Sequence, residues 1–222
     1  MPPTEASTSR KRFLTLGAAG AVGGVLAACG RDSKKPAAAT SNKKAPARDA
    51  RARDIEILNF ALTLEYVEAD FYDQIVGSGV VKEPTVLELA RRFGETERLH
   101  VGALTFAVLG LGGKPAEKPR TAFDDVLEGG PRKVLETAAM VENLGAAAYL
   151  AQAANIHDKD ILARALSIHT VEARHAAALN SLAGKGFRGG GALVGALPDG
   201  AFAKPMAMAD VLKAVKPFIA KA

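Results

Sequence analysis

The sequence predicts an all-α domain: a four-helix bundle made of two antiparallel helical hairpins joined by a long crossover, plus a short C-terminal helix. Three observations predict this fold class. Apolar residues recur at helical spacing in four segments after residue 53, no segment shows the alternation typical of strands, and the connection between the second and third segments is much longer than the other two. The 222 residues leave room for one such domain plus appendages.

The first hairpin is expected at residues 54–111. Its first helix, at 54–77, has one broad apolar face that carries Ile57, Phe60, Ala61, Leu64, Val67, Ala69 and Phe71. Its second helix, at 85–111, has Pro84 before it and Gly112 after it, which are typical start and stop signals. About seven residues join the two helices, and so short a loop favours antiparallel packing.

The second hairpin is expected at residues 131–184. Pro131 lies in the first turn of its first helix, which runs to about residue 155, and Asp158 is a candidate N-cap for the next. A short last helix at 210–221 should dock across the bundle. Residues 112–130 can span roughly 60 Å, more than the roughly 36 Å length of a 24-residue helix, so they can cross the whole bundle.

The N-terminal region is typical of an export signal at residues 1–28. A basic stretch, "SRKRFL", precedes 15 apolar residues at 14–28, too few for an ordinary membrane span. The segment ends in "LAAC", which resembles the lipobox of bacterial lipoproteins. Cys29 is the only cysteine and has no disulfide partner in the chain, so we predict that it is lipidated and anchors the protein outside the cytoplasm, on the cell membrane.

Residues 29–53 are predicted to form a lipidated, disordered, basic tether between Cys29 and the bundle, because they lack large apolar side chains. "SRKRFL" resembles the twin-arginine export motif, with Lys11 where the second arginine is expected, so twin-arginine and Sec export both stay open. Residues 1–53 hold 11 of the 29 basic residues and 3 of the 24 acidic ones, which leaves 18 against 21 in the remainder. The folded part is mildly acidic, which argues against nucleic-acid binding.

A repeated motif marks the core of both hairpins. The first has Glu65 and Tyr72 followed by Glu97 and His100, and the second has a matching set, Glu142, Tyr149, Glu172 and His175. Each Glu-x6-Tyr pair shares one helix face, and so does each Glu-x-x-His pair. Each glutamate of a hairpin lies at about the same distance from the turn. The bundle should therefore gather four carboxylates and two imidazoles at one level, a cluster whose charge of about −4 requires cations.

This ligand set is typical of di-iron and di-manganese carboxylate bundles. The chain also resembles the ferritin-like superfamily, in particular exported bacterial ferritin-like proteins and plant desiccation-related proteins, over residues 54–222. The resemblance lies in "LNFALTLEYVEADFY", "ETERLH", "VENLGAAAYL", "HTVEARHAAALNSLAG" and "DVLKAVKPFI". It implies six metal ligands, Glu65, Glu97, His100, Glu142, Glu172 and His175, of which Glu97 and Glu172 would bridge the two metals.

Three further residues were considered near this cluster. Tyr72 and Tyr149 are candidate catalytic residues that would hydrogen-bond the bridging carboxylates or carry an electron, with plain core packing as the alternative. Glu68, one turn after Glu65, is expected on a solvated helix face, with a place beside the metal ligands as the alternative.

The absence of thiolates near the cluster favours two iron or two manganese ions. Such a pair points to an oxidoreductase, ferroxidase-like or catalase-like, whose partner is dioxygen or peroxide. The alternative is a non-enzymatic metal-binding or stress- and desiccation-protective lipoprotein. A storage cage is disfavoured because a lipid anchor and tether would crowd a closed shell. The sequence leaves open whether the bundle forms a homodimer through an apolar face.

Overall fold

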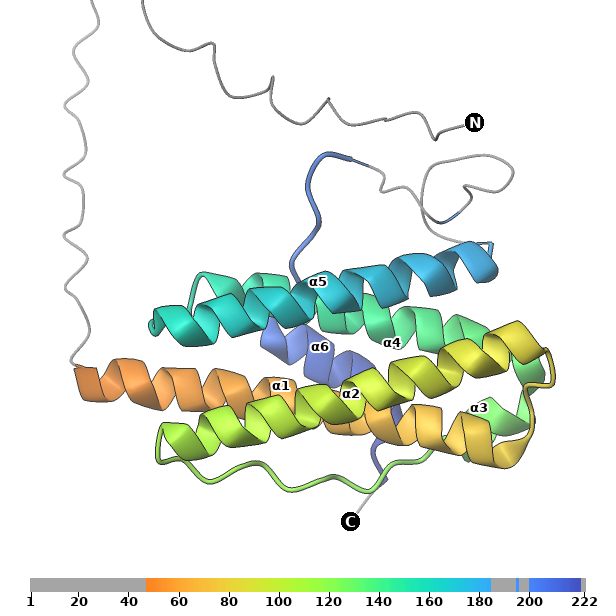
Figure 1. Cartoon of the computed structure of the whole chain (residues 1–222), viewed down its shortest axis with the longest axis horizontal. Coiled ribbons are helices and arrows are strands. Elements are labelled where there is room, and N and C mark those ends of the chain that lie inside the picture. Colours follow the sequence, from red (N-terminus) through yellow and green to blue (C-terminus); the bar gives the residue numbers. More distant parts are fainter. Residues whose placement is uncertain (1–46, 185–194, 196–199, 221–222) are drawn as a thin grey trace, which may run out of the picture. The chain divides into compact units, whose positions relative to one another are not determined.

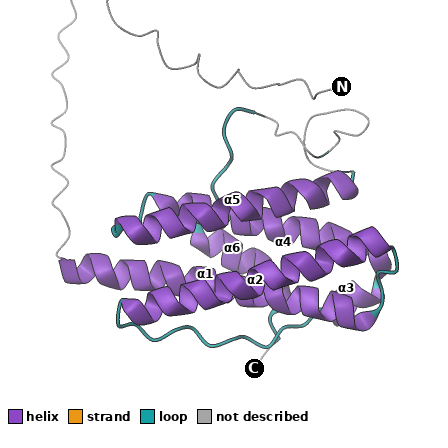
Figure 2. Ribbon diagram, in the orientation of Figure 1, coloured by secondary structure: helices purple, strands orange, loops and turns teal. Residues whose placement is uncertain are grey.

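The computed structural model describes residues 47–184, 195 and 200–220, and no strand occurs among them. Four long helices form the bundle, namely α1 (Ala47–Ser78), α2 (Pro84–Gly110), α4 (Gly130–Ala153) and α5 (Lys159–Leu182) (Figures 1 and 2). Helix α1 packs closely against α2, and α4 against α5, while contacts between these pairs are sparser. The predicted all-α bundle of two hairpins is confirmed.

Helix α1 begins at Ala47, seven residues before the predicted start at Asp54. Residues 47–53, expected as the end of the tether, are therefore helical. Two contacts between distant parts of the chain explain the longer helix. The Nε of Arg51 donates to the carbonyl of Leu111 at 2.5 Å, at the end of α2. The buried Asp54 carboxylate accepts the backbone N–H groups of His157 and Asp158, each at 2.9 Å.

The ends of the hairpin helices follow the signals in the sequence. The side chain of Glu83 accepts the Val86 N–H at 2.6 Å, and Pro84 follows at the first position of α2. Asp158 caps α5 as predicted, because its side chain accepts the N–H groups of Asp160 and Ile161 at 2.8 and 3.0 Å. After α2, Gly112 adopts a φ of 69°, which a residue with a β-carbon rarely does.

The crossover between the hairpins runs along the bundle and contains a short helix that we did not expect, α3 (Asp124–Glu128) (Figure 1). Burial of apolar side chains explains it. Phe123, which is only 1% exposed, stacks on Phe71 of α1 with ring centroids 4.4 Å apart, and Val126 is also buried. The crossover is thus anchored to the core of the first hairpin.

The C-terminal helix is shorter than predicted. Helix α6 (Met208–Val215) is followed by a 3-10 turn, η2 (Lys216–Phe218), rather than continuing to residue 221, because Pro217 lacks the N–H that an α-helix would need. Val211 and Val215 of α6 are buried against apolar residues of α1 and α4, among them Phe60, Leu64, Leu144 and Ala148. As expected, this helix docks across the bundle.

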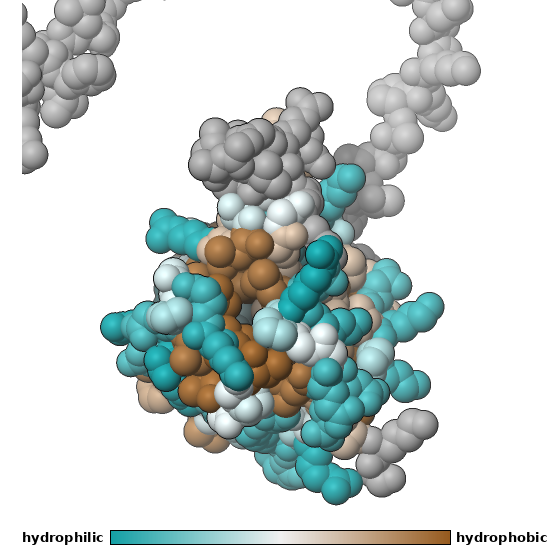
Figure 3. Space-filling model, turned by 90° about the vertical axis from the view of Figure 1, so that its right-hand side faces the viewer, coloured by the Kyte–Doolittle hydropathy of each residue, from teal (hydrophilic) through white to brown (hydrophobic). Residues whose placement is uncertain are grey.

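Apolar clusters fill both ends of the bundle. One includes Phe71, Tyr72, Phe93 and Val134, and the other includes Leu58, Leu104, Tyr149 and Ala165. Figure 3 views the end near the α1–α2 loop, where apolar and charged side chains together line a hollow of ≈ 630 Å³. The repeated glutamates and histidines of the sequence belong to neither cluster and lie between them along the helices.

The predicted signal peptide, Cys29 and most of the tether lie outside the described residues. Among the helices that the structure describes, none is long and apolar enough to cross a bilayer.

Candidate metal centre

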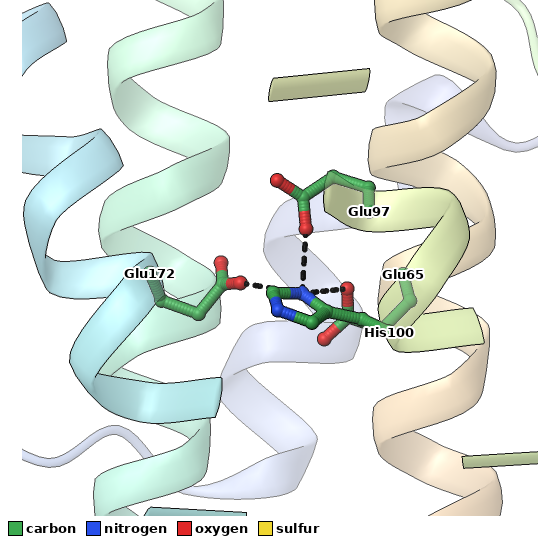
Figure 4. A group of neighbouring side chains, drawn as sticks. All are labelled: Glu65, Glu97, His100 and Glu172. Carbon is green, nitrogen blue, oxygen red and sulfur yellow. Dashed lines mark hydrogen bonds and ion pairs between the residues drawn. The ribbon is translucent and has the colours of Figure 1, made fainter. Parts of the chain in front are cut away.

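The four long helices bring the six predicted ligands together in the core. Helix α1 contributes Glu65, α2 contributes Glu97 and His100, α4 contributes Glu142, and α5 contributes Glu172 and His175. The four carboxylates are 0% exposed and the two histidines 8% and 6%. Figure 4 shows Glu65, Glu97 and His100 of the first hairpin pointing toward Glu172 of the second.

The ligand atoms form two groups. In the first, Nδ1 of His100 lies 2.8 Å from Oε2 of Glu97, 3.1 Å from Oε2 of Glu65 and 3.2 Å from Oε1 of Glu172. In the second, Nδ1 of His175 lies 2.9 Å from Oε1 of Glu97 and 3.3 Å from Oε2 of Glu142. Within each group the ligand atoms lie within 4.8 Å of one another, and Glu97 and Glu172 belong to both groups. The geometry therefore offers two adjacent cation positions that share two carboxylates.

Several of these buried atoms have no hydrogen-bond partner among the described residues. They are Oε1 of Glu97, Oε2 of Glu142, both carboxylate oxygens of Glu172, and Nδ1 of His175. The contact between His175 and Glu97 has the length of a hydrogen bond but not its direction. Buried polar atoms are normally paired, and an unpaired buried carboxylate costs several kcal/mol. Atoms that converge without pairing are suited to metal ligation.

The pKa values of the six side chains indicate which of them carry protons in the absence of metal. Burial raises the pKa of Glu65 to about 7 and also raises the pKa of Glu142 and Glu172. Burial lowers the pKa of the histidines, but the negative carboxylate oxygens close to each ring favour its protonated form and outweigh burial. They raise the pKa of His100 to about 12 and that of His175 to about 9. Protons held by the raised-pKa groups therefore offset part of the charge of the cluster, and a metal ion that binds there would have to displace them.

The two tyrosines connect the hairpins to each other. The Tyr72 hydroxyl donates to Oε1 of Glu142, and the Tyr149 hydroxyl donates to Oε1 of Glu65, both at 2.5 Å. Their partners are the two unshared glutamates and not the bridging ones, so the predicted hydrogen-bond partners are wrong. Burial raises the pKa of both tyrosines well above 10, so both hydroxyls stay protonated and donate.

The expectation that Glu68 lies on a solvated face is wrong. Its side chain is 2% exposed, and its Oε2 has no hydrogen-bond partner among the described residues. Burial, and then repulsion from Glu172, raise the pKa of Glu68 well above its ordinary 4.5. Gly145 on α4 makes room for it, because a β-carbon there would lie 2.9 Å from Oε1 of Glu68 and 2.8 Å from Oε2 of Glu172.

A signal for Glu68 exists in the repeat itself. Gly145 follows Glu142 by three residues, as Glu68 follows Glu65, so the glycine occupies the matching position in the second hairpin. A glycine inside a helix leaves room for a neighbouring group, and here that group is the Glu68 carboxylate. The two other histidines stay away from the cluster: Nδ1 of His169 lies 3.0 Å from the Ala146 carbonyl, and His157 is exposed.

An aromatic ring closes one side of the centre. Phe93 stacks on the His175 ring with centroids 3.8 Å apart and planes 20° apart. It also meets the Tyr72 ring edge to face at 5.9 Å. Phe93 thus fixes the orientation of a candidate ligand and keeps water from that side.

Comparisons with known proteins agree with this architecture. The family model described as a ferritin-like domain matches residues 53–185. A comparison with curated proteins found no match. The matched segment holds all six candidate ligands and covers more than half of the 222 residues. The chain therefore belongs to the ferritin-like domain family.

Proposed function

We propose that this domain binds two iron or two manganese ions and uses them to react with dioxygen or peroxide. The observation that carries the proposal is the sharing of Glu97 and Glu172 between two groups of buried ligand atoms. Glu65 and His100 would complete one position, and Glu142 and His175 the other. Two divalent ions would offset the charge of about −4 on the four carboxylates.

The donor set fits these metals. Carboxylates and imidazoles without a thiolate favour iron and manganese over sites for iron–sulfur clusters or structural zinc. When bound, a pair of such ions supplies one electron from each metal, so that the pair can deliver two electrons to dioxygen or peroxide. Such a reaction would be ferroxidase-like or catalase-like.

The protein groups around the ligands have distinct roles in this proposal. Tyr72 and Tyr149 hold Glu142 and Glu65 in place through their hydroxyl protons, as neighbours of metal ligands generally do. Phe93 packs on His175 and excludes water. Glu68, buried beside Glu172, can hold a proton close to the shared carboxylate.

A second candidate function is metal binding without turnover, in a sequestering or stress- and desiccation-protective lipoprotein. The complete burial of the four carboxylates favours it, because buried ligands slow the exchange of metal. Counting equivalents separates the two candidates. An enzyme loaded with iron(II) or manganese(II) consumes many equivalents of dioxygen or peroxide per chain, whereas a binding protein shows a single stoichiometric burst.

The test of the site is the metal content of the protein purified from its own host. We expect about two ions per chain in the wild type and loss of both in Glu172→Ala, since this residue belongs to both groups. Glu95→Ala is the matched control, because Glu95 is an exposed carboxylate on α2. Unchanged metal content and melting temperature in Glu172→Ala would show that the cluster is not the metal site.

We further propose that the protein is exported and anchored to the cell membrane by lipid on Cys29. The support is the sequence "LAAC" after a short apolar run. Stable anchoring needs more than one lipid chain, so two or three are expected on the mature protein. Cys29→Ser should release the protein from membranes, and a mass spectrum of exported protein with an unmodified Cys29 would contradict the anchor.

The export route bears on the metal. Iron(II) and manganese(II) bind weakly relative to copper and zinc, so a site that folds outside the cytoplasm would tend to take the wrong ion. Twin-arginine export of the folded, loaded domain would avoid this. Deletion of the twin-arginine translocase should then strand the protein in the cytoplasm. Normal export from that strain, with iron or manganese bound, would refute this route.

A further inference from the structure

A small cavity of ≈ 20 Å³, partly open to the outside, lies between α1, α2, α4 and α5, on the Tyr149 side of the candidate metal centre. Its wall includes Leu58, Ala61, Leu104, Ala148, Tyr149 and Ala165, and no polar atom is exposed on it. Two further lining residues, Gln152 and Ile156, are half-buried. The cavity therefore lies between the metal centre and the surface near the end of α4.

The chemistry of this wall selects the guest. A space of this size admits about one water molecule, but a buried water needs 2 to 4 polar partners, and this wall offers none. Apolar cavities in proteins stay dry and bind apolar guests such as xenon. A small apolar gas molecule is the class of ligand that fits here.

The cavity adjoins the candidate metal centre through a single ring. Tyr149 lines the cavity, and its hydroxyl donates to the ligand Glu65 at 2.5 Å. Leu104, on another part of the wall, lies one helical turn after the ligand His100. A guest in the cavity is thus held beside the Glu65 and His100 position.

Aromatic side chains occupy the matching place on the Tyr72 side of the bundle. Counted from the repeated glutamates, Phe71 occupies the position that Ala148 occupies in the second hairpin. Phe71 is buried and stacks on Phe123, and Tyr72 packs against Phe93, where the second hairpin has Ile168. Aromatic rings fill the Tyr72 side, whereas small side chains leave the Tyr149 side open.

We propose that this cavity is a binding site for dioxygen, which it holds next to one metal position before reaction. The claim that the bound dioxygen goes on to react rests on the proposed function, whereas the claim that the cavity binds it does not. The wall would admit dioxygen and exclude hydrogen peroxide, whose hydroxyl groups need hydrogen-bond partners. Of the two oxidants proposed above, the structure therefore favours dioxygen.

Xenon tests the binding part directly. Crystals of the metal-loaded full chain are pressurised with xenon, and the anomalous signal locates the gas. We expect one strong xenon position within the wall formed by Leu58, Ala61 and Leu104. Absence of xenon from this position would overturn the proposal.

A filled cavity tests the reaction part. Ala165→Leu places a larger side chain in the wall, and Ala90→Leu is the matched control, because both alanines are buried and lie seven residues before the shared glutamate of their helix. We expect Ala165→Leu to lose the xenon position and to consume dioxygen roughly tenfold more slowly than the control, as a loss of about 1.4 kcal/mol of binding would give. Both variants should keep two metal ions and react equally with peroxide.

The outcomes separate this proposal from the proposed function. Equal dioxygen rates in the two variants would overturn the cavity's role, while a wild type that binds two metals but consumes no dioxygen would refute the redox function itself. If Ala165→Leu does not fold, Ala61→Val with Ala138→Val as its control repeats the comparison with a smaller added volume. Those alanines both lie four residues before an unshared glutamate.

Discussion

The two hairpins carry the same ligands in different surroundings. Glu65, Tyr72, Glu97 and His100 of the first correspond to Glu142, Tyr149, Glu172 and His175 of the second, and both tyrosines bond across to the other hairpin. The positions next to them differ. The first hairpin has Glu68 and Phe71 where the second has Gly145 and Ala148. The repeat thus gives the two groups of ligand atoms matching residue types but different surroundings toward protons and gases.

The largest expected effect tests the symmetry of the ligands. Glu65→Ala and Glu142→Ala should each reduce the metal content from about two ions to about one, because each residue belongs to only one group of ligand atoms. Elemental analysis of the purified variants measures this. A variant that loses both ions, while its mate loses one, would show that the two positions fill in order.

Gly145→Ala tests the asymmetric contact. An added β-carbon would press on the carboxylates of Glu68 and Glu172, so metal affinity should fall by roughly 10- to 100-fold, as for other disturbed neighbours of ligands. Gly102→Ala on α2 is the control, since nothing lies within 4 Å of a β-carbon there, and it should stabilise the helix by about 0.5–1 kcal/mol.

The same contact allows a double-mutant test. Adding Glu68→Ala to Gly145→Ala should restore part of the metal affinity, because Glu172 can then keep its place. Competition titrations with a chelator give the affinities. Additive losses in the double variant would contradict a direct contact among these three residues.

The tyrosines test whether the two hydrogen bonds that hold the unshared glutamates are equally important. Tyr72→Phe and Tyr149→Phe each remove one hydrogen bond to an unshared glutamate and should each weaken metal binding by about tenfold. The melting temperatures of the two variants should also differ. Tyr72 packs edge to face on Phe93 at 5.9 Å and Tyr149 packs on aliphatic side chains, so we expect the smaller fall in melting temperature for Tyr72→Phe.

Glu68→Gln has the smallest expected effect, and it depends on pH. Burial raises the pKa of Glu68 well above 4.5, so the folded metal-free protein favours the protonated form and loses stability as the pH rises above 4.5. Gln removes this loss. Unfolding of the metal-free proteins should show no difference below about pH 4.5 and a gain on the order of 1 kcal/mol for the variant near pH 7. A variant less stable at pH 7 would contradict the unpaired state of Glu68.

The centre was predictable because its residues repeat at helical spacing. Glu97 and His100 share a face by the period of one helix, and equal distances from each turn place the other ligands at the same level. Glu68 was not predictable in the same way, because its spacing of three residues from Glu65 is also typical of two glutamates on the surface of a helix. Its contact with Gly145, 77 residues away, distinguishes it from a surface pair, and the sign of that contact in the sequence is the glycine at the matching position of the second hairpin.

The differences between the predicted and the observed helices also come from contacts between distant parts of the chain. The start of α1 depends on Arg51 reaching the end of α2, and α3 depends on Phe123 stacking on Phe71. Both contacts join residues far apart in the chain. Strong local signals, such as Pro84 and the Asp158 cap, predicted their helix ends closely.

The exchange of ligands between the hairpins determines when the chain can acquire metal. His100 meets Glu65 and Glu97 of its own hairpin but also Glu172 of the other, and His175 meets Glu142 of its own and Glu97 of the other. Neither hairpin alone holds a complete group. If the cluster binds metal as proposed, both positions would be complete only after the two hairpins dock, and the bound ions would then hold the assembled bundle together.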